Sequence, residues 1–115
     1  MKRNGTPVFY LSGPITGTDD YIERFGAAEE ALTRKGYTVI NPAKVNSQLP
    51  EAAEYKDYMA VSFTLLRMAD ALVTLPGSEF SRGAKYETDY AKLLGIAIIP
   101  METIEDFGPA GQEES

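Results

Sequence analysis

Glu87 is the acidic side chain with the most informative surroundings in this sequence. At about 100° per residue, a helix over residues 82–94 separates a charged face from a largely apolar one, and Glu87 lies in the middle of the apolar face. The charged face carries Arg82, Lys85, Asp89 and Lys92, and the opposite face carries Gly83, Ala84, Tyr90, Ala91 and Leu94. An ionised carboxylate among apolar neighbours is costly unless it is paired, hydrogen-bonded or facing a cavity. Glu87 is therefore a candidate site residue, and the alternative is a hydrogen-bonded acid that serves only the structure.

The residue types that are missing restrict the chemistry. The sequence contains no histidine and no cysteine, so it can form neither a Ser-His-Asp triad nor a Cys-His pair, and a typical zinc site would lack its usual ligands. Any acid, base or nucleophile must come from Asp, Glu, Tyr, Lys, Ser or Thr. We predict no metal site and no cofactor.

Two glycine-containing turns could bind an anion. Ser81 precedes the predicted helix, and Gly83 in its first turn would let a ligand approach the positive helix end. The alternative is that Ser81 only caps the helix. The second turn, over residues 12–17, matches neither the P-loop nor the GxGxxG pattern. Its simpler interpretation is a tight connection between a strand and a helix.

Apolar runs and helical spacing alternate along the chain. Helices are predicted over residues 20–35, over 82–94, and after an irregular loop at 43–55, with Tyr58, Val61, Ser62, Leu65 and Met68 on one face of the middle helix. Strands are predicted over residues 8–11, 37–40, 70–75 and 96–99. This alternation predicts an α/β fold: a small doubly wound, flavodoxin- or Rossmann-like open sheet of four to five parallel strands flanked by helices.

The predicted sheet also locates a site. Ligands of such sheets bind beyond the carboxyl ends of the strands, where the loops 12–17, 41–55 and 76–81 meet. We expect residues 1–100 to form one domain and residues 101–115, which are acidic and rich in Gly and Pro, to form a mobile tail.

Charge and composition constrain the partners. A net charge of −6 and a pI of about 4.6 lack the basic patch that polymeric nucleic acid requires. No apolar run approaches the roughly 20 residues that cross a bilayer, and no signal peptide is recognisable at the start. We expect a cytoplasmic protein that binds a small molecule and contacts neither nucleic acid nor membrane. A homodimer could close the site of so short a chain.

Three segments together resemble a known superfamily. YLSGPITG near the start, NPA after the second strand and LPGSEFSRGAKYE before the last long helix resemble the nucleoside 2-deoxyribosyltransferase-like superfamily, in particular its DUF4406 branch. The resemblance covers about residues 8–100. The string Ser81-x-Gly83-x-x-Tyr86-Glu87 also looks like that of the related 2'-deoxynucleoside 5'-phosphate N-hydrolases.

The resemblance implies roles for individual residues. Glu87 would attack the anomeric carbon and form a deoxyribosyl ester, with Tyr10 orienting it. Ser81 and Gly83 would bind a 5'-phosphate. The remaining substrate-binding candidates are Ser12, Gly13, Thr16, Asn41, Ser62 and Gly77. The implied substrate is a nucleotide or nucleoside.

The sequence departs from the superfamily pattern at two positions. Ser62 stands where these enzymes usually carry an aspartate that protonates or holds the base. A serine is no general acid near neutral pH, so Asp57 or Glu79 would have to substitute, or the base would leave unprotonated. Ser78 replaces a tryptophan common in the DUF4406 branch, which removes an aromatic surface for a base.

These observations support one leading hypothesis and two alternatives. The leading hypothesis is cleavage of the N-glycosidic bond of a 2'-deoxynucleoside 5'-monophosphate, by hydrolysis or deoxyribosyl transfer, through a covalent Glu87 intermediate. The first alternative is a non-catalytic nucleotide-binding or sequestering protein on the same fold. The second is a phosphoribohydrolase of the lysine-decarboxylase-like group, although the PGGxGTxxE motif of that group is broken between Pro76 and Glu87.

Overall fold

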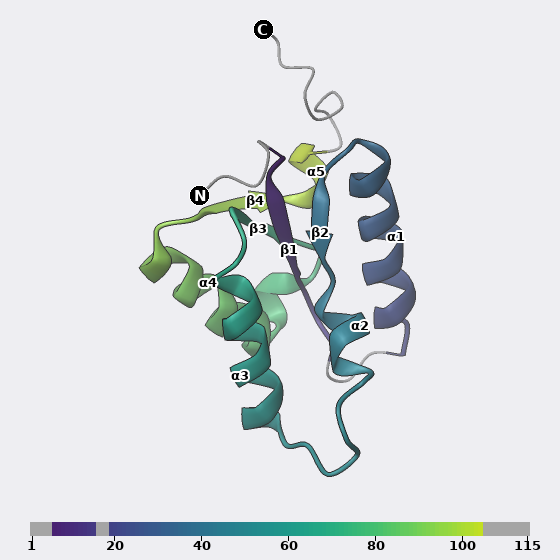
Figure 1. Cartoon of the computed structure of the whole chain (residues 1–115), viewed down its shortest axis with the longest axis vertical. Helices are drawn as coiled ribbons and strands as arrows, with labels where there is room; N and C mark the ends of the chain where they lie inside the picture. The colour runs from purple at the N-terminus through teal and green to yellow at the C-terminus, as the bar shows by residue number, and fades with distance from the viewer. Residues whose placement is uncertain (1–5, 16–18, 105–115) are drawn as a thin grey trace, which may run out of the picture.

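Four parallel strands form one open sheet in the order β2-β1-β3-β4 in the computed structural model, which describes residues 6–15 and 19–104. The strands are β1 (Val8–Ser12), β2 (Thr38–Ile40), β3 (Ala71–Thr74) and β4 (Ala97–Pro100). Helices α1 (Tyr21–Arg34) and α5 (Met101–Ile104) lie on one face, and α3 (Tyr55–Leu66) and α4 (Arg82–Leu94) lie on the other (Figure 1). This arrangement confirms the predicted doubly wound α/β sheet. None of the helices in the described ranges is long and apolar enough to cross a membrane.

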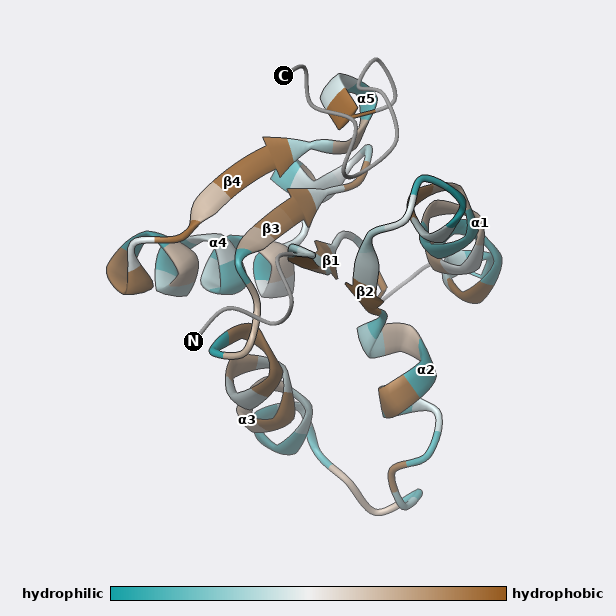
Figure 2. Cartoon of the chain, turned by 45° about the horizontal axis from the view of Figure 1, so that its top comes forward, coloured by the Kyte–Doolittle hydropathy of each residue, from teal (hydrophilic) through white to brown (hydrophobic). Residues whose placement is uncertain are grey.

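The sheet is hydrophobic because helices cover both of its faces. Phe9 and Leu11 of β1 pack with α1, whereas Val8 and Tyr10 pack on the opposite side with α3 and α4. Successive strand residues point to opposite faces, so β1 supplies both cores. Figure 2 shows the strands as mainly hydrophobic between the helices. Ser12 ends β1 on the face of Tyr10, which directs its hydroxyl toward α4.

The ends of α4 follow the expected signals. Ser81 caps the helix, and its Oγ accepts a hydrogen bond from the Ala84 amide at 3.2 Å. The helix ends at Leu94 and is capped by Gly95, whose φ of 77° suits a residue without a Cβ. The predicted bounds of this helix are therefore confirmed.

Three sequence predictions need correction. The predicted loop over 43–55 begins as helix α2 (Pro42–Asn46), because the Asn41 side chain caps it and Pro42 starts it. The predicted middle helix ends at Leu66, and Met68, expected on its apolar face, is 47% exposed.

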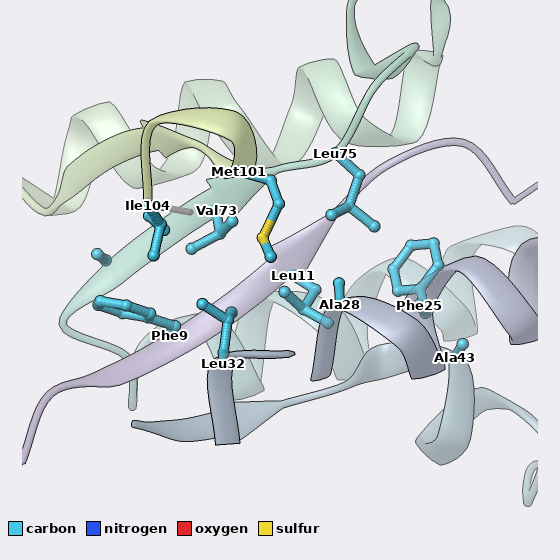
Figure 3. Packing of buried hydrophobic residues seen from close by; sticks show 11 residues of the cluster. Phe9, Leu11, Phe25, Ala28, Leu32, Ala43, Val73, Leu75, Met101 and Ile104 are labelled. Carbon is cyan, nitrogen blue, oxygen red and sulfur yellow. The ribbon is translucent and has the colours of Figure 1, made fainter. Parts of the chain in front are cut away.

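The third correction concerns the predicted tail. Its first four residues form α5, and Met101 and Ile104 are buried in the core between α1 and the sheet. Figure 3 shows Ile104 beside Val73 and Met101 close to Leu11. Residues 105–115 lie outside the described part of the chain.

Candidate functional site

The Glu87 carboxylate is held by hydroxyl groups from the central strand. The Tyr10 hydroxyl donates to Oε2 and the Ser12 hydroxyl donates to Oε1, both at 2.7 Å. The Ser62 hydroxyl of α3 also lies close enough to help lower the pKa of this carboxyl. Glu87 is only 7% exposed, so the apolar helix face does bury this acid and surrounds it with donors.

Burial and hydrogen bonding oppose each other at Glu87. Loss of hydration raises the pKa of the carboxyl above its ordinary value, and the bonds from Tyr10, Ser12 and Ser62 offset part of that rise because they stabilise the charged form. Burial and the neighbouring Glu87 raise the pKa of the Tyr10 phenol well above its usual range. Tyr10 therefore stays protonated near neutral pH and remains a donor.

A cavity of about 570 Å³ opens beside Glu87 at the carboxyl ends of the strands. This volume is in the range of small-molecule sites. Its walls come from the loops after β1 and β3, from α2, and from residues of α1, α3 and α4. The cavity therefore lies where the predicted sheet located a site, beside the point between β1 and β3 at which strand order reverses.

The start of α4 forms one wall of the cavity. Ser81, Arg82 and Gly83 all line it, and the Arg82 guanidinium lies 5.3 Å from the centre of the Tyr55 ring. Ser81 caps the helix by accepting a hydrogen bond, which leaves its own hydroxyl proton available to a ligand. Among the described lining residues, Arg82 is the one cation.

A buried polar atom without a partner lies in another wall. Asn46 of α2 lines the cavity, and its Oδ1 has no hydrogen-bond partner despite its burial. An unsatisfied buried acceptor costs about 1–3 kcal/mol. A ligand with an N–H or O–H group in the cavity would remove that cost.

Several predicted site residues lie elsewhere. Asn41 caps α2 and donates to Glu29 Oε1 at 3.0 Å, and it does not line the cavity. Gly77 adopts a left-handed turn with φ of 87° beside the Pro14 ring, also outside the lining. Ser12 is fully buried behind the carboxylate rather than facing a substrate. Thr16 lies outside the described residues, whereas Gly13 and Ser62 line the cavity.

No acid of the described lining replaces the aspartate expected at position 62. The two suggested substitutes do not line the cavity, because Asp57 bonds the Glu54 amide at the start of α3 and Glu79 is exposed. Glu87 is the one carboxylate among the described lining residues. In the described ranges no three acidic residues gather into a possible metal site.

Comparison with known proteins identifies the family. A family model described as "Domain of unknown function (DUF4406)" matches residues 7–100. The chain belongs to the DUF4406 family. No curated protein matched it.

A solved structure has a similar fold. A 2-deoxyribosyltransferase from the psychrotolerant bacterium Bacillus psychrosaccharolyticus is similar to this chain with a TM-score of 0.63 and 19% sequence identity. The match covers 81% of this chain and 70% of that enzyme. The DUF4406 chain thus shares the fold of this 2-deoxyribosyltransferase.

Several residues of this DUF4406 site, most of them aromatic, were not among the predicted site residues. Tyr55, Tyr58 and Met59 line the cavity together with Ser62, and their spacing of three or four residues along α3 was a usable signal. Phe80, which is 87% exposed, also lines the cavity. It restores an aromatic ring two residues beyond Ser78, but in a short 3-10 segment, η1 (Ser78–Phe80), which has no periodicity to reveal it.

Proposed function

We propose that this protein cleaves the N-glycosidic bond of a 2'-deoxynucleoside 5'-monophosphate through a covalent Glu87 intermediate. One observation carries the proposal: a buried carboxylate, held by Tyr10 and Ser12 at 2.7 Å each, lines a cavity large enough for a nucleotide. The Bacillus enzyme with the same fold is a 2-deoxyribosyltransferase, which supports deoxyribosyl chemistry here.

The chemistry suits a carboxylate acting without a metal ion. As the bond between C1' and the base nitrogen breaks, its electron pair leaves with the base and positive charge develops on the sugar. Glu87 stabilises that charge and then forms an ester bond to C1'. Attack on C1' by water gives deoxyribose 5-phosphate, and attack by a second base gives a new nucleotide. Either outcome releases Glu87 as a carboxylate.

The start of α4 is the proposed phosphate anchor. The Ser81 hydroxyl, the helix amides near Gly83 and the Arg82 guanidinium all lie at one wall of the cavity. Helix N-termini favour anions, and arginine pairs well with phosphate oxygens. Glu87 follows Gly83 by one helical turn, so a sugar bonded to this phosphate would lie over the carboxylate.

A second candidate function has its own observation. Glu87 is the one acid among the described lining residues, so no described carboxylic acid is placed to protonate a departing base. The same cavity with slow or absent turnover would make the protein a nucleotide-binding or sequestering protein. If turnover is slow rather than absent, the best substrates should carry bases whose anions are stable, because such bases leave without protonation.

A base-release assay distinguishes these functions. The purified protein and its Glu87→Gln variant are incubated with a panel of ribo- and deoxynucleoside monophosphates and the corresponding free nucleosides, and free base is measured by chromatography. The proposal expects release from deoxynucleoside monophosphates by the wild type alone. Binding by calorimetry without release favours the second candidate, and release confined to ribonucleotides contradicts deoxyribosyl chemistry.

The covalent step has a separate test. A 2-deoxy-2-fluoro nucleotide slows both formation and hydrolysis of the ester, so the intermediate should accumulate and add one sugar phosphate to the intact mass. Peptide mapping should find this adduct on Glu87. Turnover without any adduct, or an adduct on another residue, would remove Glu87 from the nucleophile role.

A further inference from the structure

Ser12 differs from the residues around it in the site. Its side chain is fully buried and does not line the cavity, yet its Oγ donates to Glu87 Oε1 at 2.7 Å. Tyr10 donates to the other oxygen, Oε2, at the same distance. Ser12 therefore contacts the carboxylate from the protein interior, where a substrate in the cavity does not reach.

The sheet fixes the position of the Ser12 hydroxyl. Ser12 pairs with Thr74 of β3, and its carbonyl accepts a hydrogen bond from the Leu75 amide at 2.8 Å. The next residue is Gly13, where an added Cβ would lie 3.0 Å from the Leu75 Cβ. The backbone pairing with β3 and the close approach to Leu75 hold the end of β1 in one place, so the donor is already oriented when substrate binds.

We infer that Ser12 is a positioning residue that, with Tyr10, fixes both oxygens of Glu87 and keeps the carboxylate ionised for attack on the sugar. The inference rests on the proposed function. With Tyr10 on one oxygen and Ser12 on the other, the carboxylate group is held against rotation.

The groups that face Glu87 explain why a hydroxyl matters here. They are Tyr10 and Ser12 from β1 and Ser62 from α3. The cation of the same cavity, Arg82, is not one of them, because it lies at the start of α4 against the Tyr55 ring. Neutral donors are thus the groups that stabilise the charged carboxylate. A hydrogen bond to a charged group is roughly twice as strong as one between neutral groups.

The first test measures the carboxyl group without any turnover. Carboxyl-carbon NMR titrations of the wild type, Ser12→Ala and Thr74→Val are compared, with the Glu87 signal assigned by its loss in Glu87→Gln. We expect the Glu87 midpoint to move upward in Ser12→Ala, because the charged form loses a donor. Thr74→Val removes a hydroxyl from the paired position on β3 and should leave the midpoint unchanged. An unchanged midpoint in Ser12→Ala overturns the inference.

A near-isosteric variant protects the test against a folding defect. Ser12→Cys keeps the side chain's shape but donates a weaker hydrogen bond. Its midpoint should lie between those of the wild type and Ser12→Ala, and it decides the question if Ser12→Ala does not fold. A Cys variant with the midpoint of the wild type counts against a role for the hydroxyl donor.

The second test uses the pH dependence of base release. Ser12→Ala should lower kcat about tenfold at pH values where Glu87 of the variant is protonated. Its kcat should recover as pH rises, and its KM should stay close to that of the wild type. A uniform loss at every pH would indicate general damage and overturn the inference. If the wild type releases no base, the proposed function fails, and the NMR midpoints still decide whether Ser12 stabilises the carboxylate.

Discussion

At the scale of single residues, the site depends on a charge that the fold makes costly. Glu87 is buried in the face of α4 that packs on the sheet, and its donors are hydroxyl groups. Because they compensate only partly for lost hydration, the pKa of its carboxyl remains raised. The same burial that prepares a reactive carboxylate therefore also affects stability.

Replacing Glu87 with glutamine should make stability less dependent on pH. The folded-state pKa lies above the ordinary value of 4.5, so between these two values the folded protein holds a proton that the unfolded chain has lost. The free energy of unfolding therefore falls as pH rises through this interval. The glutamine side chain of the Glu87→Gln variant does not titrate. The free energy of unfolding of this variant, relative to that of the wild type, should therefore increase with pH across the interval and level off above it.

Thermal unfolding of both proteins across a pH series measures this difference. The exposed Glu79→Gln is the matched control and should show no comparable change with pH. A gap between Glu87→Gln and the wild type that stays constant with pH would mean that the carboxyl titrates alike in the folded and unfolded chains.

Asn46 supplies a second prediction at this scale. Its Oδ1 is buried without a partner at the cavity wall, which costs stability in the empty protein. Asn46→Ala should therefore leave stability unchanged or raise it by about 1 kcal/mol, while nucleotide affinity falls about tenfold. Calorimetry and thermal unfolding test both parts, with exposed Gln48→Ala as the control. Unchanged affinity would show that no ligand donor uses this atom.

At the scale of elements, α4 is the segment in which sequence predicted most. Its bounds followed from a serine cap and a glycine stop, and its face pattern correctly placed Glu87 inside. Helix α2 was missed because five residues show no period, and its formation depends on Asn41 as cap. Asn41 was a substrate-binding candidate through the resemblance, and in the structure its side chain caps α2 and donates to Glu29.

Gly83 lies where helix stability and ligand approach compete. An added Cβ would lie 3.4 Å from the Tyr55 hydroxyl and 3.8 Å from the Met59 sulfur. Gly83→Ala should be neutral or stabilise the protein by up to about 1 kcal/mol through helix propensity, yet weaken nucleotide binding because the methyl group projects into the cavity wall. Calorimetry with a deoxynucleoside monophosphate measures the binding loss.

Gly26 provides the matched control within α1. A Cβ added there meets nothing within 4 Å, and the residue does not line the large cavity. Gly26→Ala should give a similar gain in stability with unchanged nucleotide affinity. Equal affinities for the two variants would indicate that ligands do not approach the start of α4.

At the scale of the whole molecule, alternating strands and helices were enough to predict the sheet and the edge at which the cavity opens. They could not show which side chains line it, because Tyr55 and Tyr58 face the cavity only through the packing of α3 against α4. Ser12 was likewise placed at the right edge, but its hydrogen bond to Glu87 was not predicted. A sequence locates a hydroxyl on a strand, but whether it meets a substrate or a carboxylate depends on the distance between β1 and α4.

The end of the described chain is where global packing overrode composition. Residues 101–104 looked like the start of an acidic tail, yet Ile104 is fully buried and Met101 is 6% exposed in the core on the α1 face. Ile104→Ala should therefore cost about 2–5 kcal/mol, measured by chemical denaturation, while exposed Thr103→Ala should stay within about 0.5 kcal/mol of the wild type. Because Glu87 faces the opposite side of the sheet, nucleotide affinity should persist in Ile104→Ala at temperatures where the variant is folded. Equal stability of the two variants would mean that the sheet is closed on this face without α5.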